Sequence, residues 1–217
     1  MSNLARTQPK KTRTLAMFLA YIASSKYKKS KSTYSRVISQ LRRIPAPGLG
    51  TMGVTIRDGA YVLMYDPDFL ADESLTADDI ALVLEHEFLH LLLNHIPRFS
   101  RAHRNAKSDY EKFLISKMAN IAMDYADNSL LVKMRSCTLE DLKGLGGGKY
   151  AGIYPTDVGL PPYKSMEFYL KEMLKDPDKY IKQIIDVILV DAKDCENSAP
   201  LPDGVEINVV EDRRSNT

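Results

Sequence analysis

The chain has 217 residues, of which 44% are hydrophobic and 27% charged, and a formal net charge of +2. These values are typical of a globular protein with one substantial domain, and they exclude a low-complexity or fibrous chain. Two cysteines, Cys137 and Cys195, are too few and too far apart to indicate a disulfide framework or a cysteine metal site. We therefore expect a cytoplasmic protein.

The charges are unevenly distributed. Residues 1–43 contain 11 Lys or Arg and no Asp or Glu, which leaves 19 basic and 28 acidic residues in the remainder. A basic arm of this kind can bind nucleic acid or an anionic surface, or can dock on the acidic body of its own chain. No nucleic-acid-binding motif accompanies it, so nucleic acid is an alternative partner only.

The N-terminal part of the chain predicts a disordered basic arm over residues 1–11, followed by two helices. An amphipathic pattern indicates a helix over 12–25, and a second, short helix is expected over 34–43. The apolar run Leu15 to Ala23 after basic residues also resembles a signal peptide, but it is too short to span a membrane. We expect no membrane partner.

A β-hairpin is predicted next. The β-rich runs MGVTI and AYVLMY are separated by Arg57-Asp58-Gly59, and Asp-Gly between two such runs is a strong turn signal. Asp66-Pro67-Asp68 ends the second strand.

One long central helix is expected over about 77–96. Thr76 and Asp79 fit a capping box at its start, and Pro97 is expected to stop it. The run IALVLEHEFLHLLLNH is apolar nearly all round, which is typical of a helix in the core.

The sequence H-E-x-x-H lies inside this helix, at His86, Glu87 and His90. Two histidines four residues apart share one helix face, so both imidazoles can reach one metal ion. Glu87 can then take a proton from a water that the metal activates. The alternative is a pair of core histidines bonded to backbone or carboxylate groups.

A second long helix is expected over about 108–133, and it offers a third metal ligand. Asn120, Asp124 and Asn128 recur every four residues beside its apolar stripe, and Asp124 could bind the metal while the two asparagines orient ligands. His95 is the other candidate, but it could coordinate only if the motif helix ended before it. We favour Asp124, although the stripe could also be an exposed polar face.

The C-terminal third predicts a glycine-rich connection and two further helices. Gly144 to Gly148 form a flexible connection or a substrate-side loop, because the G-K-[ST] ending of a phosphate-binding loop is missing. Helices are expected over 166–175, with Ser165 as N-cap, and over 178–193. We predict one domain over 12–195 and a polar tail over 196–217.

Several segments, in order, resemble a predicted metallopeptidase domain. The matching segments are TMGVTIRDGAYVLMYDPDFL, LEHEFLHLLLNHIPR, ANIAMDYADNSL and GLPPYKSMEFYLKEM, which lie within about residues 50–175. The family often precedes a von Willebrand A-type domain in bacterial proteins, and stand-alone versions occur, including in phages. We expect no such domain within the 217 residues of this chain. The resemblance implies that Asp124, in NIAMDYADN, is the third ligand.

Together these features predict an α+β, zincin-like fold. A small, mainly antiparallel sheet containing the hairpin would pack on the motif helix and a second long helix. The function expected is a zinc-dependent peptidase, with zinc held by His86, His90 and Asp124 and with Glu87 as general base. A peptide or protein substrate could bind along a sheet edge. The alternatives are an inactive zincin-fold binding protein and nucleic-acid binding by the basic region; the sequence does not indicate an oligomeric state.

Overall fold

The computed structural model describes residues 32–135 and 138–180. The chain has an α+β fold with a small sheet and several helices. Its elements are α2 (Ser32–Gln40), β1 (Arg42–Pro45), β2 (Met52–Arg57), β3 (Ala60–Tyr65), α3 (Pro67–Ala71), α4 (Ala77–Leu92), α5 (His95–Arg104), α6 (Asp109–Arg135), α7 (Leu139–Lys143), the 3-10 helices η1 (Leu145–Gly148) and η2 (Pro155–Val158), and α8 (Met166–Lys175).

Several sequence predictions fall outside these residues. The basic arm, the helix expected over 12–25, most of the helix expected over 178–193 and the polar tail all lie there, and they stay predictions. Among the residues described, no helix has both the length and the apolar character needed to cross a membrane.

The sheet is mixed, whereas a mainly antiparallel sheet was predicted. Its order is β1-β3-β2, with β2 antiparallel and β1 parallel to β3. β1 was not predicted, because residues up to 43 were assigned to a helix that in fact ends at Gln40. Four residues such as Arg42–Pro45 carry little strand signal of their own, and they become a strand by pairing with Val62–Tyr65.

The hairpin of β2 and β3 is confirmed. Arg57 pairs with Ala60, so the loop between them has two residues, Asp58 and Gly59. Both have a positive φ, 54° and 76°, which is the backbone of a type I′ turn. In the described part of the chain no strand pairs with the other side of β2, so β2 is an edge strand.

The motif helix starts where it was predicted and ends earlier. Thr76 and Asp79 form the expected capping box at the start of α4. α4 ends at Leu92, however, because Asn94 adopts a left-handed conformation with a φ of 54°. Pro97 was predicted to stop the motif helix, and this prediction is wrong. Pro97 lies in the first turn of α5, where the missing N–H breaks no helical hydrogen bond.

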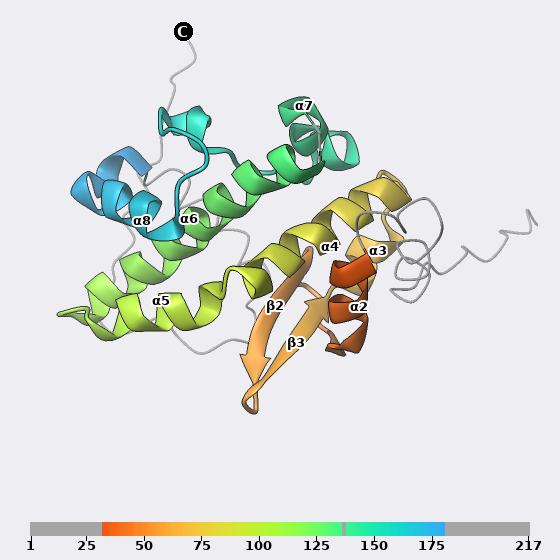
Figure 1. Cartoon of the computed structure of the whole chain (residues 1–217), viewed down its shortest axis with the longest axis horizontal. Coiled ribbons are helices and arrows are strands. Elements are labelled where there is room, and N and C mark those ends of the chain that lie inside the picture. Colours follow the sequence, from red (N-terminus) through yellow and green to blue (C-terminus); the bar gives the residue numbers. More distant parts are fainter. Residues whose placement is uncertain (1–31, 136–137, 181–217) are drawn as a thin grey trace, which may run out of the picture.

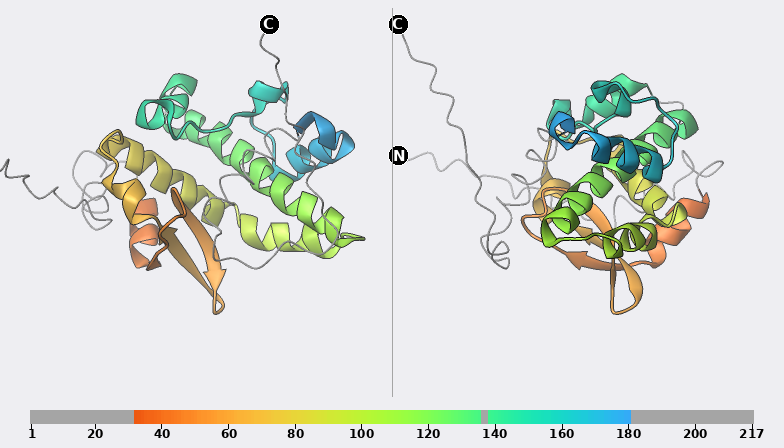
Figure 2. Two further views of the ribbon diagram at one scale, coloured as in Figure 1. Left: turned by 180° about the vertical axis from the view of Figure 1, so that it is seen from behind. Right: turned by 90° about the vertical axis from the view of Figure 1, so that its left-hand side faces the viewer.

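The elements form layers around α4 and α6, which lie side by side (Figure 1). The sheet and α2 cover one side of α4, and α8 packs on α6, as both further views show (Figure 2). The apolar character of α4 follows from this position, because Ile80 and Leu84 pack towards the sheet while Leu82 and Leu89 pack towards α6 and α7. Full burial of each such side chain contributes about 1.5–3 kcal/mol.

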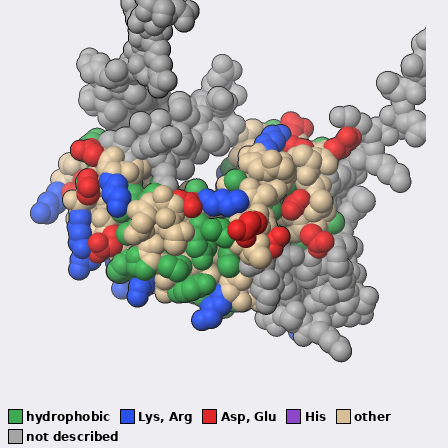
Figure 3. All heavy atoms as spheres, turned by 90° about the horizontal axis from the view of Figure 1, so that it is seen from above, with side chains coloured by type: hydrophobic (Ala, Val, Ile, Leu, Met, Phe, Trp, Pro, Cys, Tyr) green, Lys and Arg blue, Asp and Glu red, His purple; other side chains and the backbone are tan. Residues whose placement is uncertain are grey.

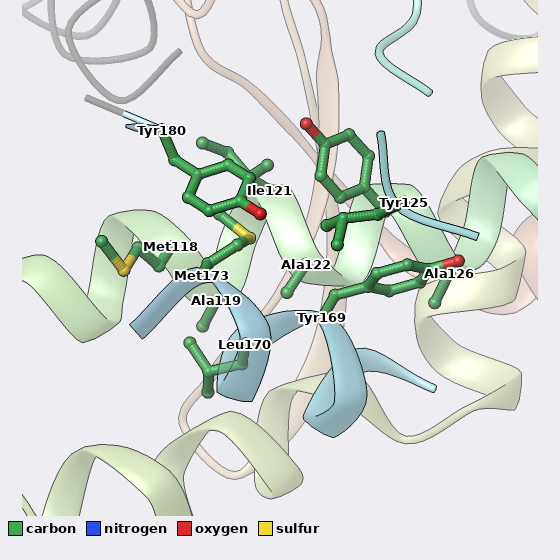
Figure 4. Packing of buried hydrophobic residues seen from close by; sticks show 11 residues of the cluster. Met118, Ala119, Ile121, Ala122, Tyr125, Ala126, Tyr169, Leu170, Met173 and Tyr180 are labelled. Atoms are coloured by element: carbon green, nitrogen blue, oxygen red, sulfur yellow. The ribbon is translucent and has the colours of Figure 1, made fainter. Parts of the chain in front are cut away.

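The contact of α6 with α8 fixes the orientation of α6. Figure 4 shows Ala122 and Tyr125 of α6 packed against Tyr169 and Leu170 of α8. The rings of Tyr125 and Tyr169 meet edge to face, with centroids 5.6 Å apart. Seen from above, this side of the molecule gathers hydrophobic side chains with lysine and arginine side chains around them (Figure 3). With its apolar stripe held by α8, α6 presents its polar residues to α4.

Asp66 fixes the loop that leads into β2. Its buried carboxylate accepts hydrogen bonds from the backbone N–H groups of Gly48 and Gly50, at 3.0 and 2.8 Å, and from Asp68 N at the start of α3. Both glycines have a positive φ, 87° and 71°, a conformation that other residues rarely adopt. One carboxylate thus joins the start of the edge strand to a helix cap.

We expect Asp66→Ala to lower the free energy of unfolding by about 2–4 kcal/mol, because it removes a helix cap and leaves several N–H groups without their charged acceptor. Urea unfolding followed by circular dichroism would measure this. Asp68→Ala, at the neighbouring exposed position, is the control and should change the free energy by less than about 1 kcal/mol. Equal effects of the two substitutions would contradict the role given to Asp66.

Candidate metal centre

Two histidines of α4 and one aspartate of α6 bring three ligand atoms together. His86 and His90 lie one turn apart, and their Nε2 atoms are 3.1 Å from each other. Asp124 Oδ1 lies 3.4 Å from the first Nε2 and 3.3 Å from the second. The three atoms form a nearly equilateral triangle, so the structure brings His86, His90 and Asp124 together, and their role as metal ligands stays a prediction.

Asn128 determines which nitrogen of His86 carries a proton. The Nδ2 group of Asn128 donates a hydrogen bond to the carbonyl of Ile153 at 2.8 Å, so its Oδ1 is the atom that faces His86 Nδ1 at 2.9 Å. An amide oxygen only accepts, so His86 Nδ1 must donate. In the neutral ring, Nε2 then presents a lone pair to the triangle.

Asp127 has the corresponding role at His90. It is fully buried, and its Oδ2 lies 2.9 Å from His90 Nδ1 and 3.3 Å from His95 Nδ1. His90 Nδ1 thus lies between the imidazole of His95, at 3.1 Å, and the carboxylate of Asp127, and the charge of this carboxylate stabilises a proton on the nitrogen. With its proton on Nδ1, His90 presents the lone pair of Nε2 to the triangle. The buried Nε2 of His95 and both carboxylate oxygens of Asp127 have no hydrogen-bond partner among the described residues.

The pKa values of these groups follow from the clustering of acceptors. Burial is the largest single effect and lowers the pKa of His86 and of His90, but the nearby carboxylates, Asp124 first, together outweigh it. Both pKa values are therefore raised, that of His90 strongly. Burial likewise raises the pKa of Asp124, and the two histidines hold it well below its usual range. Without a metal, the triangle is therefore stabilised by a proton that it takes up.

The edge strand holds Glu87. Burial raises the pKa of Glu87, and its Oε2 accepts a hydrogen bond from Val54 N at 2.8 Å. In a strand that is paired on one side, the main-chain groups of successive residues point alternately towards the paired strand and away from it. Thr51 O, on the paired side, accepts a hydrogen bond from Asp66 N just beyond the end of β3, and Val54 follows Thr51 by three residues. The N–H of Val54 therefore points to the outer edge of β2, which brings this edge beside the motif helix.

These side chains line a cavity of about 660 Å³, which lies within the usual range for small-ligand sites. His86, Glu87, His90, Asp124 and Asn128 all contribute to its wall. The side chain of Asp124 is 26% exposed, whereas that of Asp127 is 0% exposed. An ion that enters the cavity can reach Asp124, but Asp127 lies behind His90.

The ligand atoms fit a tetrahedral metal ion. Metal–ligand distances of about 2.0–2.2 Å place neighbouring tetrahedral ligands about 3.3–3.6 Å apart. Two sides of the triangle, 3.3 and 3.4 Å, lie in this range, and the third, 3.1 Å, is slightly shorter. Three lone pairs that face one another repel unless a cation lies between them, so the chemistry of the donors also fits. His86, His90 and Asp127 form another group whose ligand atoms lie within 4.8 Å, but Asp127 is at the Nδ1 side of His90.

Some residues of this centre were predicted from the sequence, and others were not. The motif residues, Asp124 and the orienting role of Asn128 were all considered, and the structure places them together. α4 does end before His95, but the His95 ring contacts His90 Nδ1, the nitrogen that faces away from the triangle. Asp127 and Val54 were missed. The i, i+3 spacing of Asp124 and Asp127 was the available signal for the first, and a backbone N–H gives no signal in a sequence.

Comparison with known proteins defines the class to which the chain belongs. A family model described as "Putative metallopeptidase domain" matches residues 21–137. This is more than half of the chain, so the protein belongs to this family, as the resemblance in the sequence predicted. Neither a curated protein nor a solved structure gives a significant match. A phage context stays a prediction.

We expect zinc binding at this centre to weaken as the pH is lowered. Histidine binds a metal only through an unprotonated nitrogen. Because the pKa values of His86 and His90 are raised, protons already compete with the metal at pH values above the ordinary pKa range of histidine. Competition titration against a chromophoric chelator at a series of pH values would measure this, and an affinity that stays constant through and just above that range would contradict it.

Proposed function

We propose that the protein is a zinc-dependent peptidase of the zincin type, with His86, His90 and Asp124 as the protein ligands of the metal and Glu87 as the general base. The observation that carries the proposal is the convergence of two Nε2 lone pairs and one carboxylate oxygen at tetrahedral spacing, beside a buried glutamate. Family membership supports the coarser statement that the chain is of the metallopeptidase type.

The residues around the triangle prepare it for a metal. Asn128 accepts the Nδ1 proton of His86, and the charge of Asp127 favours a proton on His90 Nδ1, so that both rings keep Nε2 available. Zinc, when bound, supplies a Lewis acid that polarises the scissile carbonyl and lowers the pKa of water. Because the three ligands come from two helices that the core holds in place, the site is formed before the ion arrives.

Glu87 performs the proton transfers in this proposal. Val54 N–H holds Oε2, which leaves Oε1 as the oxygen that takes a proton from the attacking water and passes it to the leaving amine. The raised pKa of Glu87, caused first by burial, brings it closer to the working pH of a general base. The bond from Val54 keeps the carboxylate in the cavity wall rather than in solvent.

A peptide is the substrate that this cavity favours. Residues 51–54 line it, and Met52–Val54 are the first residues of β2, the edge strand. By the same alternation that directs Val54 N–H outward, the main-chain groups of Met52 and the carbonyl of Val54 also point to the outer edge. Such an edge can pair with an extended peptide main chain.

We expect Glu87→Ala to retain zinc and to lower peptide hydrolysis by about 10²–10⁴-fold, because it removes the general base and no ligand. His86→Ala should lose both zinc and hydrolysis. Zinc content would be measured by elemental analysis of the purified full chain, and hydrolysis with an unbiased peptide library. The exposed Glu73→Ala serves as control. Full activity of Glu87→Ala, or a wild type that holds no zinc after loading, would refute the proposal.

The assignment of ligands predicts an order of zinc affinities. Asp127→Asn should weaken zinc binding by about 10–100-fold, because it disturbs only the orientation of His90. Asp124→Ala should cause a larger loss, and His95→Ala a smaller one than Asp124→Ala. Circular dichroism would verify that each variant is folded. If Asp124→Ala left zinc affinity unchanged while Asp127→Asn abolished it, Asp127 rather than Asp124 would be the ligand.

A further inference from the structure

The cavity has an apolar end beyond the metal centre. Leu82 and Val83 precede His86 by about one turn of α4, and Leu131 follows Asn128 by about one turn of α6, so these side chains lie at the same end. Leu142, Leu145 and Tyr150 close this end from the segment after α6. We call these six residues the apolar recess.

The wall of the recess is chemically uniform. Its leucines are almost completely buried, with exposed fractions between 1% and 5%. Among the described residues that line the whole cavity, the acidic, basic and histidine side chains are His86, Glu87, His90 and Asp124, all in the candidate metal centre. A charged side chain in the recess would lose its hydration without gaining a partner, whereas an apolar one would gain by burial.

The recess is held in shape by the segment that closes it. The Tyr150 hydroxyl donates to Asp72 Oδ2 at 2.7 Å, in the loop that precedes α4. Two glycines allow tight packing there: a Cβ at Gly146 would lie 2.7 Å from the Tyr150 ring, and one at Gly152 would lie 2.8 Å from Leu142 Cγ. Since Tyr150 directs its hydroxyl to Asp72, its ring adds apolar surface to a preformed wall.

We propose that the apolar recess is the specificity subsite of the enzyme, and that it takes a large apolar side chain of a peptide, of the size of Leu, Met or Phe, next to the bond that is cleaved. This inference rests on the proposed function and adds the class of substrate. The recess is about one helical turn, roughly 5.4 Å, from the metal ligands. This lies between the lengths of one and two residues of an extended peptide, roughly 3.3 and 6.6 Å. Acidic and basic side chains are excluded from this position.

Val83 offers a test with a matched control. It is a partly buried residue of α4 that lines the cavity, and Val132 of α6 is a partly buried residue that packs on the same core cluster but does not line the cavity. Val83→Phe should fill the recess, while Val132→Phe should add the same volume elsewhere. Val83→Ala, which enlarges the recess, gives a second variant that keeps the test valid if the larger side chain is not tolerated.

The first measurement uses zinc-loaded full-length protein and a peptide series that differs at one position between Ala, Leu, Phe, Asp and Lys. The wild type should cleave the Leu and Phe peptides with a kcat/KM at least about tenfold above the Asp and Lys peptides. Val83→Phe should lower the ratio of Leu to Ala cleavage about tenfold or more at unchanged zinc content. Val83→Ala should shift the preference to the larger side chain, and Val132→Phe should leave it unchanged.

The second measurement separates the inference from the proposed function. Equilibrium binding of the same peptides would be measured with the zinc-loaded Glu87→Ala protein, with and without Val83→Phe. Selective binding of Leu and Phe peptides that Val83→Phe abolishes would support the recess even if the wild type hydrolysed nothing, in which case the proposed function alone fails. Binding or cleavage without apolar preference, or equal effects of Val83→Phe and Val132→Phe, would overturn the inference.

Discussion

The packing of α4 against α6 is the contact on which the centre depends. The two histidines come from α4. The groups that contact their Nδ1 atoms, and the oxygen that completes the triangle, come from α6. Neither helix can bind a metal tightly alone. The surrounding layers hold the two helices together, because the sheet packs on α4 from one side and α8 packs on α6 from the other.

Local signals predicted the starts of α4 and α8 and the turn between β2 and β3. Thr76 and Asp79, the Asp58-Gly59 turn and Ser165 act through bonds and backbone angles of near neighbours in sequence, so the sequence alone determines them. The end of α4 was mispredicted because Pro97 was taken as the stop. The helix breaks at Asn94, a residue that tolerates a positive φ but does not require it. β1 was missed because it exists only through pairing with a distant strand.

The candidate centre was predictable in its residues and less so in its geometry. The motif predicted two histidines on one helix face, and a carboxylate in an apolar stretch of α6 predicted Asp124. The sequence could not show which side of an imidazole each carboxylate would meet. Asp124 and Asp127 are three residues apart on one helix, yet the first contacts Nε2 atoms and the second Nδ1 atoms. That difference arises from how deeply each lies between two helices.

The bond from Asn128 to Ile153 ties a connecting segment to the protonation of His86. Loops generally diverge in sequence more freely than the elements they join. Here the group that matters is a main-chain carbonyl, which every amino acid supplies, so residue 153 can change its side chain without consequence for His86. What must be inherited is the path of the chain at that point. Selection on the metal centre would therefore act on the length and course of this segment, and a comparison of side chains among related proteins would not reveal it.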